Sequence, residues 1–272
     1  QVVQFNNIKY TIGSKKMYAE IFNQLIKLVR PFMKAQGFIS RGNNFYKRHP
    51  QGNIGIINFQ KNREGFPRFT INVGIYSVVL AKYFLAEFNQ KVVKEYPSLG
   101  DYHWESRIGS LVPIQNPARQ RDEDWRKFGD KWWWYDDTSN VEKLFNEIKS
   151  LILDYGISEI DQHITDQQLQ TAWLAEAGTG GPNRLKYLCV LLEHSGDKEQ
   201  RSTVLNEFGK FMQSHPELTG LKKHYDRFIK EADLNKEEKC STPRNLNQTS
   251  AKRSVSEKKP SISENPSKKI KP

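Results

Sequence analysis

Residues 53–80 read NIGIINFQKNREGFPRFTINVGIYSVVL, and they contain the clearest strand pattern in the chain. β-Branched and aromatic residues dominate both of its halves, and Gly65 and Pro67 lie between them, which is typical of antiparallel strands joined by a turn. In the second half, apolar residues occupy every other position from Phe69 to Ile75. Because successive side chains of a strand point to opposite faces, we expect one core face and one polar face.

The polar positions of these strands form the first candidate site. Ile54 and Ile56 share a face with Asn58 and Gln60, so the first strand changes from apolar to polar along its length. The candidate ligand- or partner-binding residues here are Asn58, Gln60, Thr70 and Asn72, with Arg107 nearby. Side-chain amides bind other amides, carboxylates or base edges through paired hydrogen bonds, so this surface suits binding rather than catalysis. In the structural alternative, these groups bond to neighbouring loops and backbone.

The elements around these strands indicate an α+β fold. A helix is expected from Lys15, because apolar residues recur at helical spacing, and Gly37 would end it. Pro31 would kink that helix or end it early. The pattern of residues 38–49 predicts a further strand, which precedes the strands of residues 53–80. The expected architecture is an N-terminal helix, then an antiparallel sheet with helices on one face, then an all-helical extension and a disordered basic tail.

Further elements follow along the chain. They are a helix over 80–96, a strand within 101–113, a surface loop over 115–130, a short aromatic strand over 131–137, and a helix over 141–155 capped by Thr138 or Ser139. Beyond Gly156 the pattern is all-helical, and the Gly-rich break Gly178–Pro182 indicates a boundary. The expected divisions are an N-terminal segment 1–14, a sheet domain 15–177, a helical extension 178–234 and a disordered tail 235–272.

Positive charge is concentrated in the predicted tail. The chain of 272 residues has 42 Lys and Arg against 31 Asp and Glu, which gives a net charge of +11. Residues 235–272 contain 10 basic and 4 acidic residues, so the tail carries +6 and the rest carries +5. The body is therefore only mildly basic. The tail is either a weak, salt-sensitive polyanion-binding segment or a solvated terminus.

Cysteine usage and hydropathy bear on the compartment. Cys189 and Cys240 are the 2 cysteines, and they provide neither a disulfide framework nor a metal-binding spacing, which fits a reducing compartment. No stretch reaches the roughly 18–20 apolar residues that span a bilayer, and the first residues lack the order of a signal peptide. We expect a cytoplasmic protein with no membrane association and no cofactor.

The run KWWWYDD at residues 131–137 is the second candidate site. Trp132, Trp133 and Trp134 cannot all point inward from a strand, so at least one should be partly exposed. An exposed Trp beside Arg or Lys can stack on a base or anchor a protein partner. In the structural alternative, Trp132 and Trp134 fill one core and the helical extension covers Trp133.

Basic residues near the strand ends form a third candidate, suited to phosphate. They are Arg41, Lys47, Arg48, Lys61, Arg63 and Arg68. Such residues also prevent edge-to-edge strand pairing, which is the structural alternative. A metal-dependent nuclease would draw on Asp136, Asp137, Glu147 and Lys149, but Glu147 and Lys149 are two residues apart on a predicted helix and do not share a face. The 6 histidines show no metal-binding spacing.

Five ordered motifs resemble a known family. They are GFISRGNNFYKR, IGIINFQKN, RFTINVGIY, RIGSLVP and DKWWWYDD. In this order they resemble the family called domain of unknown function 4304, an uncharacterised bacterial family, over about residues 15–174. The matching positions are Gly42, Asn43, Phe45, Asn58, Gln60, Arg107, Ile108, Gly109, Lys131, Trp132 and Trp133. The resemblance implies a fold and a bacterial setting but no activity, and it leaves Trp134 and the basic tail unexplained.

Binding therefore leads the functional expectations. The first is a non-enzymatic binding module with a protein partner, and by analogy a toxin-immunity or phage-defence accessory role. The second is nucleic-acid binding through the basic strand-end residues and the tail. The third is an uncharacterised metal-dependent nuclease. The identity of the ligand and the oligomeric state stay open.

Overall fold

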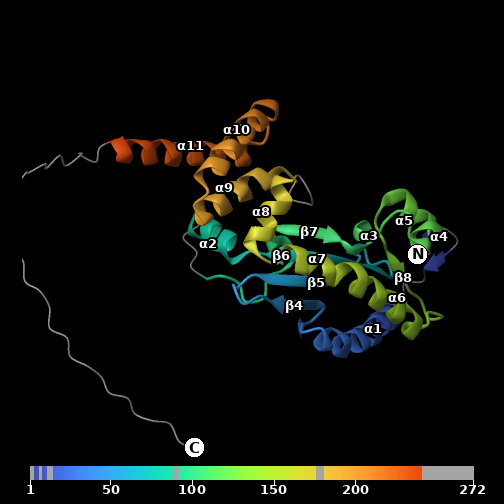
Figure 1. Cartoon of the computed structure of the whole chain (residues 1–272). Coiled ribbons are helices and arrows are strands. Elements are labelled where there is room, and N and C mark those ends of the chain that lie inside the picture. Colours follow the sequence, from blue (N-terminus) through green and yellow to red (C-terminus); the bar gives the residue numbers. More distant parts are fainter. Residues whose placement is uncertain (1–2, 6–7, 11–14, 88–91, 176–180, 241–272) are drawn as a thin grey trace, which may run out of the picture. The chain divides into compact units, whose positions relative to one another are not determined.

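An antiparallel sheet lies at the centre of the fold, and helices run along one of its faces (Figure 1). The computed structural model describes residues 3–5, 8–10, 15–87, 92–175 and 181–240. The strands are β1 (Val3–Phe5), β2 (Ile8–Tyr10), β3 (Ile39–Arg41), β4 (Asn44–Arg48), β5 (Ile54–Lys61), β6 (Arg68–Tyr76), β7 (Trp104–Arg107) and β8 (Trp133–Trp134). The α-helices are α1 (Lys15–Ala35), α2 (Val78–Glu87), α3 (Ile108–Leu111), α4 (Pro117–Arg121), α5 (Glu123–Phe128), α6 (Val141–Leu151), α7 (Ser158–His163), α8 (Asp166–Leu174), α9 (Arg184–Ser195), α10 (Lys198–Ser214) and α11 (Thr219–Cys240). Shorter turns are the 3-10 helices η2 (Leu99–Asp101) and η4 (Gly181–Asn183) and the π-helix η3 (Ile152–Ile157).

The predicted fold class is confirmed. The main sheet has the order β3-β4-β5-β6-β7, and β8 pairs with β6 beside β7. All of these pairs are antiparallel. Gly42, at φ 59°, occupies the tight β3–β4 turn, where a left-handed backbone favours glycine. β1 and β2 form a separate two-stranded ribbon that the sequence does not predict.

Helix α1 forms as expected and ends before Gly37, whose φ is 84°. Pro31 lies inside the helix, and the helix continues beyond it to Ala35. The α1 face toward the sheet carries Phe22 and Val29, which are both buried. The ring of Phe22 meets that of Phe69 on β6 edge-on at 5.5 Å, so α1 covers one face of the sheet.

The helix-covered face of the sheet is closely packed and contains the main core. It carries alternate residues of β5 and β6, including the buried residues Ile57, Phe59, Phe69, Ile71, Val73 and Ile75. A Cβ added at Gly55 would collide with Ile160 of α7, and one at Gly156 would touch Ile57 and Val73. Glycine at these two positions therefore lets the helical layer approach the strands closely.

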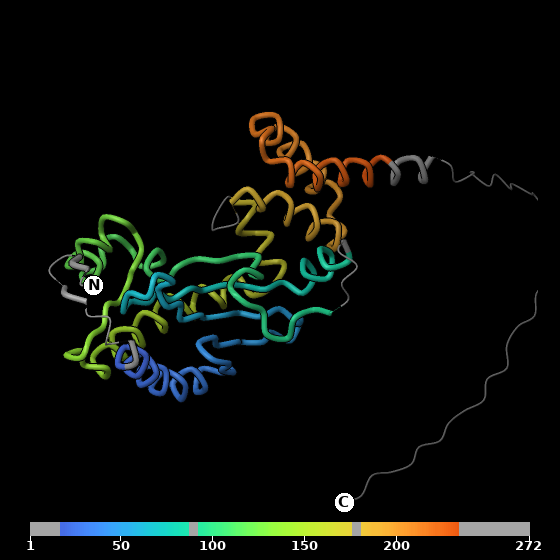
Figure 2. Tube along the Cα trace, turned by 180° about the vertical axis from the view of Figure 1, so that it is seen from behind, coloured from blue at the N-terminus to red at the C-terminus, as the bar shows by residue number. Residues whose placement is uncertain are grey.

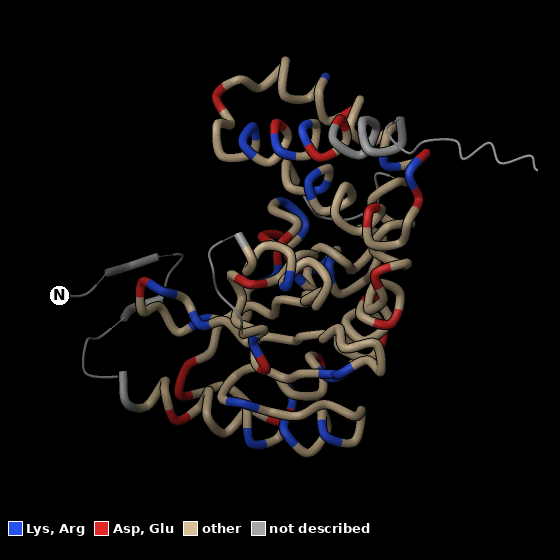
Figure 3. Tube along the Cα trace, turned by 90° about the vertical axis from the view of Figure 1, so that its left-hand side faces the viewer, with Lys and Arg blue, Asp and Glu red and all other residues tan. Residues whose placement is uncertain are grey.

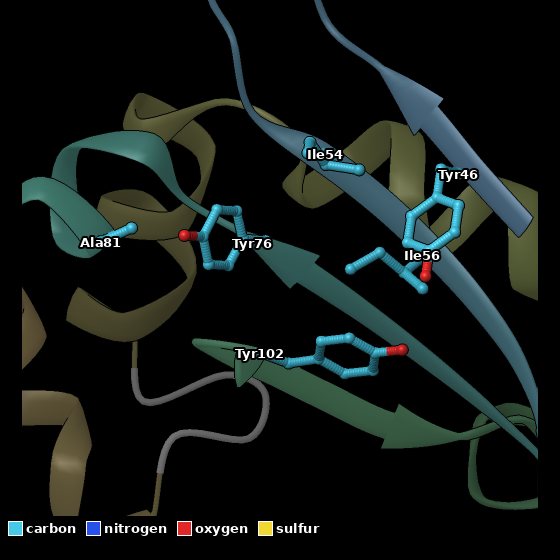
Figure 4. Close-up of a cluster of buried hydrophobic side chains, with 6 residues drawn as sticks. All are labelled: Tyr46, Ile54, Ile56, Tyr76, Ala81 and Tyr102. Atoms are coloured by element: carbon cyan, nitrogen blue, oxygen red, sulfur yellow. The ribbon is translucent and has the colours of Figure 1, made fainter. Parts of the chain in front are cut away.

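The opposite face of the sheet is apolar at one end. Figure 4 shows Tyr46, Ile54, Ile56, Tyr76 and Tyr102 gathered there, together with Ala81 of α2. The ring of Tyr102 lies directly over Gly74, where an added Cβ would collide with it. The expected change of character along β5 is confirmed, because Ile54 and Ile56 pair with Tyr76 and Gly74, whereas Asn58 pairs with Asn72.

Several local predictions were wrong. The helix predicted over 80–96 is α2, which starts at Val78, and residues 92–96 are not helical. By contrast, the strand predicted within 101–113 is confirmed as β7, which ends at Arg107 and is followed by α3. The loop predicted over 115–130 contains α4 and α5, because Asn116 and Asp122 accept hydrogen bonds from backbone N–H groups of the first turns. Asn140, rather than Thr138 or Ser139, caps α6.

The predicted helices after residue 156 are confirmed, and part of the extension packs against the sheet domain. Helix α9 lies beside α2, α8 and α10 (Figure 2). Tyr187 of α9 meets His103, just before β7, edge-on at 5.3 Å. Residues 176–180, at the predicted Gly-rich break, lie outside the described residues. Helix α11 runs to Cys240, and residues 241–272 of the predicted tail also lie outside them.

Within the described ranges, no helix combines the length and the apolar character needed to cross a membrane.

Candidate functional site

The predicted amide residues meet on the polar half of the sheet. Asn72 donates from Nδ2 to Oδ1 of Asn58 and to Oε1 of Gln60, at 2.9 Å in both cases. Asn58 donates in turn to Oδ1 of Asn44 on β4 at 2.6 Å. Asn72 is only 5% exposed. The expected polar face of β6 is therefore covered rather than open, and its amides largely satisfy one another.

Thr70 and Arg107 are tied to the segment that follows α5. Thr70 is fully buried and donates to the carbonyl of Lys131 at 2.9 Å. Arg107 lies opposite Asn72 in the β6–β7 register and forms an ion pair with Asp130. Residues 130–131 thus cover the polar half of β6. Thr70 and Asn72 therefore have structural roles, and Arg107 lies at the edge of the covered region.

The three tryptophans divide between the two faces of the sheet. Trp133 is 3% exposed and stacks on Phe69 in the main core, with ring centroids 5.5 Å apart. Its Nε1 donates to Glu147 at 3.0 Å. Trp132 is partly buried and Trp134 is 38% exposed. The packing in which Trp132 and Trp134 fill a core is therefore wrong, because the pairing of Trp133 with Phe69 turns its two neighbours to the opposite face.

Arg68 lies between the two outward tryptophans. Its guanidinium carbon is 4.8 Å from the ring centre of Trp132 and 4.9 Å from that of Trp134. The guanidinium of Arg107 is 5.2 Å from the same ring of Trp132. Within the described residues, Arg68 has no carboxylate partner, and its buried Nε makes no hydrogen bond. Cation–π contacts hold this group together, and we call Arg68, Arg107, Trp132 and Trp134 the Arg–Trp cluster.

Two hollows flank the Arg–Trp cluster. The first, the basic groove, has a volume of about 390 Å³ and is lined by Gln60, Lys61, Asn62, Arg63, Glu64, Arg68, Arg107 and Trp132. The second, the aromatic pocket, has a volume of about 250 Å³ and is lined by Arg68, Asp122, Asp124, Trp125, Phe128, Asp130, Trp132 and Trp134. The structure therefore brings Gln60, Arg107, two tryptophans and three of the predicted basic residues into one region.

Lys47 and Arg48 lie toward the opposite end of the strands, and Arg41 lies beside the β3–β4 turn. All three have local contacts. The guanidinium carbons of Arg41 and Arg48 lie 3.8 and 5.3 Å from the ring centre of Tyr96. Lys47 forms an ion pair with Asp161 at 2.5 Å. Along the described trace, Lys and Arg alternate with Asp and Glu instead of forming one continuous basic stripe (Figure 3). The six predicted basic residues thus do not form a single surface.

The predicted nuclease residues have separate structural contacts. Asp136 accepts a hydrogen bond from the Thr138 hydroxyl at 2.8 Å, and this bond lowers the pKa of the Asp136 carboxyl. Glu147 accepts from Trp133 instead. In the described parts of the chain, no three His, Cys, Asp or Glu side chains lie close enough to hold a metal ion.

Phe128 and Asp124 are pocket residues that the sequence reasoning missed. Both belong to α5, within the segment predicted to be a loop. A signal for this helix was present, since Asp122 precedes Glu123 and Asp124, and acidic residues favour a helix N-terminus. Phe128 is 67% exposed at the helix end. The position of α5 at the aromatic pocket cannot be read from that signal.

Comparisons with known proteins identify the family of this region. Residues 29–162 match the family model described as Domain of unknown function (DUF4304). No curated protein and no solved structure matches the chain. The matched residues include the sheet, the Arg–Trp cluster and both hollows. The expected family relationship is therefore confirmed over residues 29–162, which match the DUF4304 family model.

Proposed function

We propose that this chain is a non-enzymatic binding module whose partner is a protein, and that the Arg–Trp cluster and the aromatic pocket contact that partner. The observation that carries the proposal is the position of Arg68 between Trp132 and Trp134, with no carboxylate partner among the described residues. A guanidinium held between two rings has little freedom left to lose, so binding a carboxylate or a carbonyl to it costs little entropy.

The composition of the region favours a protein over a polyanion. Trp and Arg are enriched among the residues that dominate protein interfaces. Phe128 is 67% exposed and Trp134 is 38% exposed, and both line the aromatic pocket. Asp122, Asp124 and Asp130 line it as well. Lys131 pairs with Asp122 and Arg107 with Asp130, so the charge of Asp124 is the one that would repel phosphates.

A matched pair of surface variants tests this proposal. Full-length wild type, Phe128→Ser and Ile39→Ser would each be used as bait for affinity capture from source-cell lysate with quantitative mass spectrometry. Ile39 is 49% exposed on β3, and it serves as the control because it also removes an exposed apolar side chain. We expect at least one protein to be retained by wild type and by Ile39→Ser and to be lost by Phe128→Ser.

The captured protein would then be titrated against the purified variants. Phe128→Ser should weaken binding of the captured protein at least about tenfold, as expected for a hot-spot residue of an interface. Equal capture by all three baits, or no specific capture, would overturn the proposal. If the captured protein is the product of a neighbouring gene, this would support a more specific role for the binding module, in toxin immunity or as an accessory to phage defence.

A second candidate function is nucleic-acid binding in the basic groove. The observation that favours it is that Lys61, Arg63, Arg68 and Arg107 line the groove together with Trp132, against the single carboxylate of Glu64. Bases could stack on the ring while the basic side chains contact the phosphates. This use of the groove would not need the aromatic pocket.

Fluorescent single-stranded and double-stranded DNA and RNA would test this second candidate at low and moderate salt. The full chain would be compared with Lys61→Ala/Arg63→Ala, and with Lys268→Ala/Lys269→Ala as a charge-matched control in the tail. Salt-sensitive binding that only the groove variant weakens would support the candidate. Binding that only the tail variant weakens, or no binding at all, would exclude the groove as the nucleic-acid-binding site.

A further inference from the structure

The basic groove and the aromatic pocket meet at the Arg–Trp cluster, because Arg68 and Trp132 line both hollows. Trp134 lines only the aromatic pocket, and Arg107 lines only the basic groove. An extended peptide rises roughly 3.3 Å per residue, so side chains a few positions apart can enter two adjoining hollows. One segment of a partner that passes over Arg68 can therefore occupy both.

The basic groove has more positive than negative charge. Lys61 and Arg63 are exposed, and neither they nor Arg68 form an ion pair within the described ranges. The charge of Arg107 is compensated by its own ion pair. Glu64 is the one carboxylate that lines the groove. Three cations thus face one carboxylate, which favours a ligand with negative charge.

Arg68 is the cation whose position is most restricted. Its guanidinium carbon lies 4.8 and 4.9 Å from the ring centres of Trp132 and Trp134. Among the described residues, no group accepts a hydrogen bond from it. A planar guanidinium with N–H donors to spare binds a carboxylate through two parallel hydrogen bonds. We therefore expect a carboxylate of the ligand to lie over Arg68.

The aromatic pocket has a different chemistry. The aromatic side chains that line it are Trp125, Phe128, Trp132 and Trp134. Ion pairs compensate Asp122 and Asp130, and Asp124 is the lining carboxylate that has none within the described part of the chain. The volume of about 250 Å³ is below the roughly 300–1,000 Å³ of small-molecule sites and suits a single side chain. An apolar side chain is thus favoured here, and an acidic one is disfavoured.

We propose that the protein partner binds through one extended segment, with an aromatic or large aliphatic side chain in the aromatic pocket and neighbouring Asp or Glu side chains over Arg68 and in the basic groove. This inference rests on the proposed function, because it specifies the chemistry of the partner that the Arg–Trp cluster contacts. A nucleic acid in the basic groove would leave the aromatic pocket empty.

NMR titration of the full-length protein with synthetic peptides tests this inference. The probes are acetyl-Gly-Phe-Glu-Glu-Gly-amide, an analogue with Gln in place of both Glu, and an analogue with Ala in place of Phe. We expect saturable binding of the first peptide with a dissociation constant of about 1 mM or lower. Each analogue should bind about fivefold more weakly, because one lacks the charges that face the groove and the other lacks the ring that fills the pocket.

Matched variants connect the binding to the two hollows. Arg68→Gln should abolish the preference for the Glu peptide over the Gln peptide. Arg63→Gln should reduce this preference about twofold, and it tests the groove even if Arg68→Gln does not fold, whereas Arg30→Gln, at an exposed position of α1, should leave it unchanged. Phe128→Ser should weaken both Phe-containing peptides, and Ile39→Ser, outside both hollows, should weaken neither.

Equal binding of the Glu and Gln peptides, or no saturable binding at millimolar concentration, would overturn the inference. Binding of a short oligothymidylate in the groove without binding of the Glu peptide would overturn it in favour of a nucleic acid. If Phe128→Ser loses a captured protein while the peptides show no preference for Glu, the proposed function stands and only this inference fails. Lysate capture that does not depend on Phe128 would overturn the proposed function itself.

Discussion

Asn72 on β6 lies directly opposite Asn58 on β5, and its Nδ2 donates a hydrogen bond of 2.9 Å to Oδ1 of Asn58. The same amide donates to Gln60, two residues further along β5, at 2.9 Å. A polar pair, in which Asn72 is buried and Asn58 is partly buried, therefore takes the place of an apolar pair at the point where this face of the sheet changes character. Buried amides stabilise a fold only while each has its partners.

Removing the central amide should leave its acceptors without a donor. Asn72→Ala is expected to lower the free energy of unfolding by about 1–3 kcal/mol, because the oxygens of Asn58 and Gln60 lose their hydrogen bonds. Urea denaturation of the purified variant measures this change. Asn146→Ala, at an exposed position of α6, is the control and should stay within about 0.5 kcal/mol of wild type. Equal effects of the two substitutions would contradict the role of the amide pair.

Adjacent tryptophans should differ sharply in their contribution to stability. Trp133→Ala is expected to cost about 3–5 kcal/mol, because it opens a cavity beside Phe69 in the main core. Trp134→Ala is expected to cost only about 1 kcal/mol, because its side chain is 38% exposed. Thermal and urea unfolding of both variants provide the comparison. A larger loss for Trp134→Ala would mean that the faces of β8 are assigned the wrong way round.

Gly74 should tolerate no side chain under the ring of Tyr102. An added Cβ would overlap this ring, so Gly74→Ala is expected to destabilise the protein by about 1–3 kcal/mol through overpacking. Gly100→Ala is the matched control, because its Cβ would meet no atom within 4 Å. Denaturation midpoints of the two variants test this. If Gly74→Ala unfolds like wild type, Tyr102 does not cover the sheet as described.

His103 should make stability depend on pH. Its pKa in the folded state is lowered to about 3, primarily by burial, whereas an unfolded histidine titrates near 6.5. Above pH 6.5 both states are neutral, and as pH falls toward 3 only the unfolded state takes up the proton. The resulting loss of stability should reach about 2 kcal/mol at pH 5.

Two measurements check the behaviour of His103. An NMR titration should find its imidazole still neutral at pH 5. The stability of His103→Asn, which keeps an acceptor for the hydrogen bond that the N–H of Ser77 donates to Nδ1 of His103, should fall less than that of wild type between pH 7 and pH 5. A His103 pKa near 6.5, or parallel pH profiles for the two proteins, would refute this expectation.

The part of the candidate site that the sequence predicts is the part that depends on strand alternation. Residues 54–76 alternate so regularly that the grouping of Asn58, Gln60, Thr70 and Asn72 on one face follows from the period of a strand. That this face is covered does not follow, because Tyr102 and residues 130–131 reach it from distant parts of the chain. Alternation assigns residues to faces, but it does not say what packs on each face.

The first helix, the antiparallel strands and the family relationship can be predicted from the amino-acid sequence, because these depend on local periodicity and on ordered motifs. Which tryptophan is buried depends on the packing of the folded chain, because the period of a strand allows either assignment of Trp133, and the pairing with Phe69 selects one. Only the tertiary structure also placed Arg68 between Trp132 and Trp134, and Tyr187 against His103. Contacts between residues so far apart in the chain depend on how separate elements share a core, and no local pattern records that.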